Sequence, residues 1–140
     1  MKPKALLVDD LATHGRLAYC ELVRWFDVTV TGNAMEALIL LEEHRFDVVI
    51  AELNLGAGPN GIDVMRAVAE TDPGARRVLM SKWLRAGRLT RDAAHRFVLR
   101  PWPVGDLLAA AVGVQAEPHP QALKHPSLVE WDPSPSQHTN

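Results

Sequence analysis

The chain alternates between short runs of apolar, often β-branched residues and longer segments in which apolar residues recur with a helical period. Runs this short are typical of strands and do not reach the length of a helix. The five predicted strands contain residues 6–8, 28–30, 48–50, 78–80 and 97–99. Apolar residues three and four positions apart predict amphipathic helices between and after them. These stripes lie within residues 18–25, 34–41, 62–69 and 104–111.

Strands alternating with helices favour an α/β fold with a parallel sheet. Because these strands are apolar almost throughout, we expect both faces of the sheet to be covered by helices. Residues 82–95 have a poor apolar stripe interrupted by Gly87, which predicts only a short or irregular helix there.

The composition changes near residue 114. Five of the ten prolines fall between Pro118 and Pro135, among serine, histidine and glutamine. We therefore divide the chain into a globular domain, 1–114, and a proline-rich tail, 115–140, that is either flexible or docked on the domain.

Composition excludes several classes of protein. The chain has 140 residues, of which 47% are hydrophobic and 23% charged, with a formal charge of −2. The single cysteine, Cys20, excludes an intrachain disulfide framework. The first residues are too poor in apolar side chains for a signal peptide, and no stretch reaches the ~18 apolar residues of a membrane span. We expect a cytoplasmic protein with no membrane association.

Polar residues follow four of the five predicted strands. They are Asp9 and Asp10, Glu52 and Asn54, Ser81, and Arg100. Each alone has an ordinary explanation, such as a helix cap or a turn. In open α/β sheets, however, ligands bind outside the carboxyl ends of the strands, where the strand order reverses. With the strand order 2-1-3-4-5, these side chains would converge on one cleft.

Residues 4–113 resemble a response-regulator receiver domain, the phospho-accepting module of two-component signalling. The resemblance rests on residues 7–10, 47–54, Gly61, 78–81 and 97–102. It implies a flavodoxin-like fold: a doubly wound, five-stranded parallel sheet of order 2-1-3-4-5 with helices on both faces.

The resemblance also implies roles for single residues. In such domains an acidic pair, here Asp9 and Asp10, helps to hold magnesium, and an aspartate after the third strand accepts the phosphoryl group. A hydroxyl after the fourth strand, here Ser81, and a lysine before a proline contact the phosphate. An aromatic residue in the fifth strand, here Phe97, reports the state of the domain, although an ordinary core role for Phe97 is equally expected.

Two positions depart from this pattern. Glu52 stands in the place of the acceptor aspartate, and Arg100 in the place of the lysine. Phosphoryl transfer depends on positioning, and a misplacement of ~1 Å can cost ~10²-fold in rate. We expect that Glu52 is not phosphorylated. Its carboxylate would instead accept a hydrogen bond from Ser81 and form a two-pronged ion pair with Arg100.

Metal binding is expected to be weak or absent. Asp9, Asp10, Glu52 and Asn54 offer the oxygen ligands that Mg²⁺ prefers, but pairing with Arg100 would compete for Glu52. No cofactor is therefore expected to be required.

Residues 76–100 contain eight basic residues against one acidic residue. The simplest expectation for this stretch is a solvated face with partly structural arginines. The alternative is a basic docking surface for a protein partner, either a histidine kinase or a downstream signalling protein. The overall charge of −2 disfavours nucleic acid, and a homodimer is left open.

Together these features predict a non-enzymatic, stand-alone pseudo-receiver of a bacterial two-component or phosphorelay system that works through protein–protein contacts without phosphorylation. One alternative is a working phosphoreceiver with an unusual acceptor. Another is a small aspartyl phosphohydrolase, which the sequence disfavours because no Asp-x-Asp pair follows the first strand.

Overall fold

The computed structural model describes residues 1–10, 15–82, 92–100, 102 and 105–113. These residues form one parallel sheet with the strand order β2-β1-β3-β4-β5. The predicted fold class and strand order are confirmed. The expected irregular helix within 82–95 falls mostly outside the described residues, and the expected tail lies wholly outside them.

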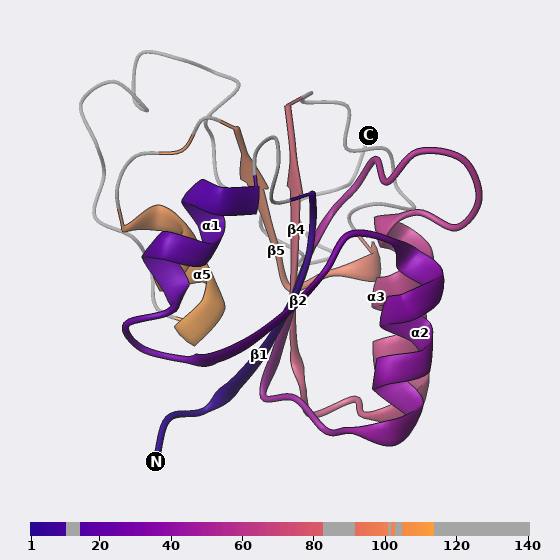
Figure 1. Ribbon diagram of the computed structural model, residues 1–140, viewed down its shortest axis with the longest axis horizontal. Coiled ribbons are helices and arrows are strands. Elements are labelled where there is room, and N and C mark those ends of the chain that lie inside the picture. Colours follow the sequence, from indigo (N-terminus) through magenta and orange to yellow (C-terminus); the bar gives the residue numbers. More distant parts are fainter. Residues whose placement is uncertain (11–14, 83–91, 101, 103–104, 114–140) are drawn as a thin grey trace, which may run out of the picture.

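All five predicted strands are present. They are β1 (Lys4–Val8), β2 (Asp27–Thr31), β3 (Val48–Glu52), β4 (Arg76–Ser81) and β5 (Arg96–Leu99). The described helices are α1 (Gly15–Leu22), α2 (Ala34–Glu43), α3 (Gly61–Thr71) and α5 (Asp106–Val112). Figure 1 shows α1 and α5 together on one side of the sheet and α2 and α3 on the other.

Each face of the sheet has its own core because side chains alternate along a strand. In β1, Ala5 and Leu7 pack with residues of α1 and α5, including Leu22 and Leu107. Leu6 and Val8 belong to the core under α2 and α3. All four of these β1 side chains are fully buried. The alternation therefore determines on which face a residue just beyond a strand emerges.

The first helix is shorter than its apolar stripe predicted. Helix α1 ends at Leu22, and the backbone N–H of Trp25 donates to the carbonyl of Leu22 in a turn. Trp25 is 59% exposed, so its assignment to the buried stripe was wrong. Spacing alone could not reveal that the helix stops before Trp25.

Candidate functional site

The carboxyl ends of β1, β3 and β5 bring three charged residues to one edge of the sheet. Backbone pairing continues one residue beyond the strands: the N–H of Asp9 donates to Thr31 O at 2.9 Å, and the N–H of Arg100 donates to Ser81 O at 2.7 Å. Glu52 is the last residue of β3 and pairs in register with Met80. These residues therefore stand on the sheet itself, which restricts their backbone movement.

Arg100 bridges two carboxylates from neighbouring strands. Its Nε donates to Oε2 of Glu52 at 3.0 Å, and its Nη2 donates to Oδ2 of Asp9. The sequence predicted a two-pronged pair between Arg100 and Glu52 alone. Instead, one donor of the guanidinium engages Glu52 and another engages Asp9, so one cation is shared between two anions.

The three charges are shielded from water. The side chains of Arg100, Asp9 and Glu52 are 6%, 5% and 14% exposed. An ion pair at this depth interacts more strongly than one on the surface, but each charge has lost much of its hydration. Removing Arg100 would take from Asp9 and Glu52 the buried cation that they share.

Burial raises the pKa of the Glu52 carboxyl above its ordinary value of 4.5. The hydrogen bond and the charge of Arg100 oppose this rise, as does the backbone N–H of Asn54, while the nearby charge of Asp9 adds to it. Because the loss of hydration has the largest effect, the folded chain holds a proton on Glu52 more readily than an exposed glutamate would.

The guanidinium of Arg100 is held from further directions. Its Nη2 lies 3.8 Å from Sδ of Met80, and its Cζ lies 5.0 Å from the centre of the Trp102 ring. A cation over an indole ring gains a favourable cation–π contact. Arg100 therefore has partners on β1, β3 and β4 as well as on the segment that follows β5.

Trp102 is in turn fixed by Glu21 of α1. The indole N–H of Trp102 donates to Oε2 of Glu21 at 2.6 Å. Oε1 of Glu21 accepts from the backbone N–H of Gly105 at 2.8 Å and of Leu108 at 3.3 Å. Gly105, the N-cap of α5, has no side chain to cap the helix, so Glu21 supplies the missing acceptor. The site residue Arg100 is thus linked through Trp102 and Glu21 to the α1–α5 layer.

Helix α3 is brought close to Glu52 by a glycine. A Cβ at Gly61 would lie 2.4 Å from the carbonyl oxygen of Glu52, a distance that no side chain tolerates. The N–H of Gly61 donates to Leu53 O at 2.9 Å, and Asn60 caps the helix in a capping box with Asp63. The glycine that supported the family resemblance is therefore required by this close approach.

The other predicted site residues occupy different positions around this pair. Asp10 is exposed, and its backbone N–H donates to Oδ1 of Asp9 at 2.8 Å. Ser81 is 2% exposed at the end of β4; its predicted hydrogen bond to Glu52 stays a prediction. Phe97 is 5% exposed and packs in the core under α2 and α3. Asn54 accepts at its Oδ1 from the N–H of Gly56 at 3.2 Å.

The residues proposed for a metal do not fit one as they stand. Oδ2 of Asp9 and Oε2 of Glu52 face the guanidinium of Arg100, and Oδ1 of Asn54 accepts a loop N–H. Among the described residues, no three His, Cys, Asp or Glu side chains are grouped as a metal site requires. A divalent cation would also have to sit beside a permanent positive charge.

The described basic residues of the stretch 76–100 lie in different surroundings. Among its described members, Arg76 and Arg77 lie half-buried at the start of β4, and Nε of Arg76 donates to Ala110 O at 2.7 Å. Lys82 follows the opposite end of the same strand and is exposed, whereas Arg100 is 8% exposed. These described residues agree with the alternative of partly structural arginines, and the docking surface for a protein partner stays a prediction.

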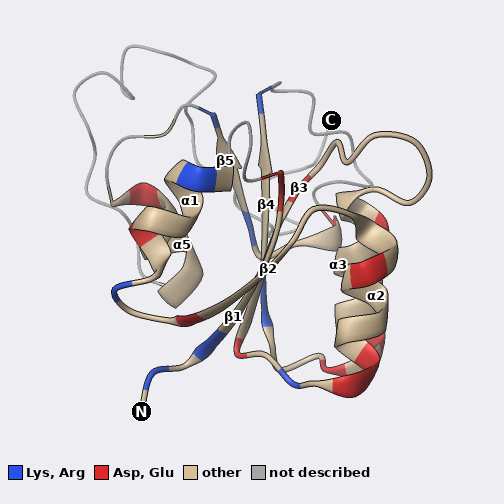
Figure 2. Cartoon of the chain, viewed as in Figure 1, with Lys and Arg blue, Asp and Glu red and all other residues tan. Residues whose placement is uncertain are grey.

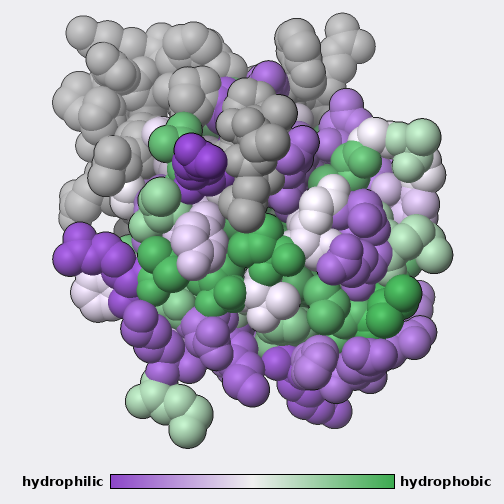
Figure 3. Space-filling model, in the orientation of Figure 1, coloured by the Kyte–Doolittle hydropathy of each residue, from purple (hydrophilic) through white to green (hydrophobic). Residues whose placement is uncertain are grey.

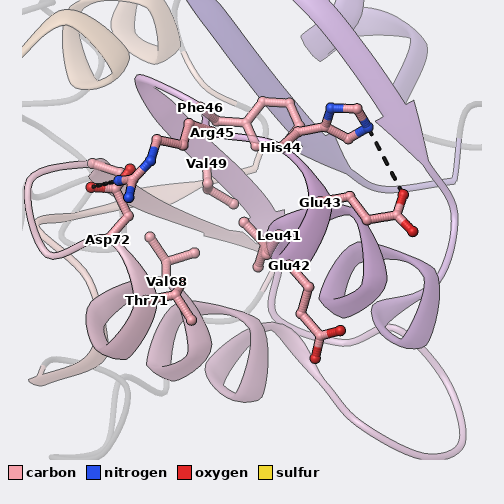
Figure 4. A pocket seen from close by; sticks show the side chains of 11 residues that line it. Leu41, Glu42, Glu43, His44, Arg45, Phe46, Val49, Val68, Thr71 and Asp72 are labelled. Atoms are coloured by element: carbon pink, nitrogen blue, oxygen red, sulfur yellow. Dashed lines mark ion pairs between the residues drawn. The ribbon is translucent and has the colours of Figure 1, made fainter.

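The described residues line two sizeable hollows on different elements. A groove of about 720 Å³ at the α1–α5 layer is lined by Leu17, Trp25, Trp102 and Leu108, and Arg100 also reaches it. A second hollow of about 420 Å³ lies at the amino end of β3. Figure 4 shows it between the ends of α2 and α3, with Arg45 paired to Asp72 across it. The charged site lies at the opposite end of β3 from this second hollow.

The surface is mixed in character. In Figure 3 hydrophobic residues cross the middle of the visible face, with hydrophilic residues below them. Met35 and Ile39 of α2 are 56% and 53% exposed. Figure 2 shows acidic segments gathered where α2 and α3 end, away from the charged site. None of the described helices combines the length and the hydropathy that a membrane crossing requires.

Sequence reasoning missed both the Asp9 arm of the bridge and the Glu21–Trp102 link. A signal for the first was present. Two-residue alternation places Asp9 on the face of Leu7, Glu52 on that of Ile50, and Arg100 on that of Val98. All three therefore emerge toward α1 and α5. No comparable pattern connects Glu21 with Trp102, because they are 81 positions apart.

No protein-family model matches the chain, and no curated protein matches it by sequence. Its fold is nevertheless that of response-regulator receiver domains, and solved structures show this. The receiver domain of a sensor histidine kinase from Pseudomonas aeruginosa, solved with magnesium in its active-site cleft, matches with a TM-score of 0.69 and 17% identity, covering 81% of this chain and 99% of that one.

Two further solved structures have the same fold. A response regulator from Thermotoga maritima matches with a TM-score of 0.67 and 21% identity, over 81% of this chain and 97% of that one. A response regulator from Burkholderia pseudomallei, which carries a phosphorylated aspartic acid, a calcium ion and citrate, matches with a TM-score of 0.64 and 24% identity, over 79% of this chain and 66% of that one.

Proposed function

We propose that this chain is a receiver-type signalling module of a two-component or phosphorelay system, that it works without being phosphorylated, and that it acts by contacting other proteins. The fold supports the first part, since its solved neighbours are receiver domains of a sensor kinase and response regulators. The site supports the second part.

The observation that carries the proposal is the ion pair between Glu52 and Arg100, with 3.0 Å between Oε2 and Nε. An acceptor carboxylate must attack phosphorus in line, with its oxygen free and its counter-charges placed around the incoming phosphoryl group. Oε2 of Glu52 is engaged by the guanidinium, and Oε1 faces the backbone N–H of Asn54 at 3.5 Å. These two contacts on the Glu52 carboxylate support the proposal that it does not act as an acceptor.

A module held in this way has no chemical step of its own, so its output must come from binding. We propose a histidine kinase or a downstream signalling protein as the partner. The chain would present one stable surface rather than two interconverting ones, because the permanent charge of Arg100 is matched by carboxylates on two neighbouring strands.

The test is incubation with a small-molecule phosphodonor, such as acetyl phosphate with Mg²⁺, followed by intact-protein mass spectrometry. We expect no species heavier by ~80 Da, the mass of one phosphoryl group. A phosphorylated Glu52, located by peptide mapping, would overturn the proposal and establish the alternative of a working phosphoreceiver with an unusual acceptor.

A designed variant provides the positive control. The double substitution E52D/R100K restores the two residue types that the receiver pattern has at these positions, and we expect it to gain the ~80 Da species. The single substitution E52D keeps the arginine and should be labelled less. If the double variant folds but is not labelled, the departures at Glu52 and Arg100 are not what prevents phosphorylation, and the proposal loses its basis.

A further inference from the structure

We propose that Arg100 takes the place of a divalent cation in this pocket, so that the guanidinium is the counter-ion that Asp9 and Glu52 would otherwise require from a metal. This inference rests on the proposed function, because both concern the same pocket. Its test, however, measures metal occupancy and needs no phosphodonor.

Arg100 contacts the carboxylates that a metal ion would use. A metal ion between the ends of β1 and β3 would draw one oxygen from each strand. Arg100 draws these same groups, with Nη2 directed at Oδ2 of Asp9 and Nε at Oε2 of Glu52. The guanidinium is planar and offers several donors in a fixed fork, so a single side chain can reach two acceptors that a lysine ammonium would reach only as a point charge.

Arg100 also supplies the positive charge that the two carboxylates need. Asp9 and Glu52 are 5% and 14% exposed at their side chains, and two ionised carboxylates this close to each other and this shielded require positive charge. Arginine stays protonated at any pH that a protein tolerates, so it supplies that charge permanently. A divalent cation added to the pocket would meet the guanidinium at short range and would be repelled by it.

Arg100 is held in place by several neighbours. Its backbone N–H is bonded to Ser81, Sδ of Met80 lies 3.8 Å from Nη2, and the Trp102 ring lies 5.0 Å from Cζ. Trp102 is itself held by Glu21 of α1. Arg100 is therefore held by Trp102 and, through Trp102, by Glu21 of helix α1. A metal ion could not take its place simply because an exposed side chain rotated away.

Two substitutions of Arg100 remove the forked set of guanidinium donors. In R100K the compact ammonium lacks the planar fork that reaches both Glu52 and Asp9, and in R100Q the positive charge is lost altogether. Each variant frees oxygen ligands of the kind that hard divalent cations prefer. We expect both variants to bind Mn²⁺ more tightly than the unmodified chain does, by on the order of 100-fold for R100Q and less for R100K.

The full chain and its variants are titrated with Mn²⁺, and electron paramagnetic resonance measures the concentration of the free ion. Mg²⁺ is then added as a competitor. K82Q is the matched control, because Lys82 is an exposed cation at the same end of the sheet and lines the same groove as Arg100. Its removal should leave Mn²⁺ binding unchanged. D9N combined with R100K should abolish the gain, because it removes one of the two released carboxylates.

A second measurement covers the case in which R100Q does not fold alone. Circular dichroism with and without Mn²⁺ should then show that the metal restores its secondary structure, while the melting temperature of the unmodified chain should be the same in Mg²⁺ and in a chelator. The inference would be overturned if the unmodified chain bound Mn²⁺ saturably and the D9N substitution abolished this binding. A folded R100K that binds no more Mn²⁺ than the unmodified chain would also overturn it, a result that would leave the proposed function standing.

Discussion

Two arginine–carboxylate pairs lie at opposite ends of strand β3 and show how surroundings change the role of the same chemistry. Arg100 and Glu52 at the carboxyl end are 3.0 Å apart, with side chains 6% and 14% exposed. Arg45 and Asp72 at the amino end are 3.6 Å apart, with side chains 81% and 29% exposed (Figure 4). Water solvates the second pair almost as well apart as together, whereas the first pair has lost this alternative.

The difference extends to what surrounds each arginine. Arg100 also contacts Asp9, Met80 and the Trp102 ring, so its removal would disturb several groups at once. Arg45 lies on the rim of a hollow and is mostly in solvent. The comparison predicts that the carboxyl-end pair is a structural requirement and that the amino-end pair is dispensable.

The largest effect is expected from R100A. It removes the cation that two buried carboxylates share, and breaking a buried ion pair in this way typically costs about 3–5 kcal/mol. Urea unfolding followed by circular dichroism measures the change in the free energy of unfolding. A loss below about 1 kcal/mol, the range of an exposed pair, would show that the carboxyl-end pair is not buried in solution.

A smaller effect is expected from E21A, which tests the support beneath Arg100. This variant removes the acceptor of Trp102 Nε1 and of two backbone N–H groups that open α5. The expected loss in the free energy of unfolding is about 2 kcal/mol. E42A is the matched control, since Glu42 lies exposed on α2, and it should change stability by less than about 0.5 kcal/mol. Equal losses in the two variants would contradict the assigned role of Glu21.

The contribution of Glu52 to stability is expected to depend on pH, because its carboxyl gains or loses a proton. The pKa of Glu52 is raised above 4.5 in the folded chain, chiefly by burial. Between that value and the folded pKa, the folded state binds more protons than the unfolded state, so the contribution of Glu52 to stability falls as pH rises. It is fully present below about pH 4.5 and is lost as the pH passes through the folded pKa.

The measurement is the free energy of unfolding of the unmodified chain minus that of E52Q. It is determined by urea titration at a series of pH values that begins below the ordinary pKa of 4.5 and increases from there. We expect this difference to decline with rising pH. A difference that increases with pH would mean that attraction to Arg100 outweighs the loss of hydration.

The smallest effect is expected from R45A at the other end of β3. Arg45 is 81% exposed at its side chain, so its pairing with Asp72 is screened by water. We expect the free energy of unfolding to change by less than about 0.5 kcal/mol. A loss approaching that of R100A would remove the distinction between the two ends of the strand.

Much of the architecture was predictable from the chain, and the reason is local. Apolar runs at residues 6–8 and 48–50 predicted strands that the structure confirms as β1 and β3. The runs are continuous because a strand that is buried on both faces is apolar along most of its length. The convergence of Asp9, Glu52 and Arg100 followed from their places at strand ends. Trp25 was predicted to be buried and is exposed, because spacing does not show where a helix ends.

The sequence by itself therefore determined the strands, the parallel sheet and the set of charged residues at its carboxyl edge. Only the tertiary structure decided that Arg100 is shared between Asp9 and Glu52 and that Glu21 of α1 supports it through Trp102. The physical reason is the separation along the chain over which each signal acts. Periodicity reports how a residue relates to neighbours a few positions away, whereas a buried ion pair depends on distances between side chains 48 and 91 positions apart, which exist only once the sheet has formed.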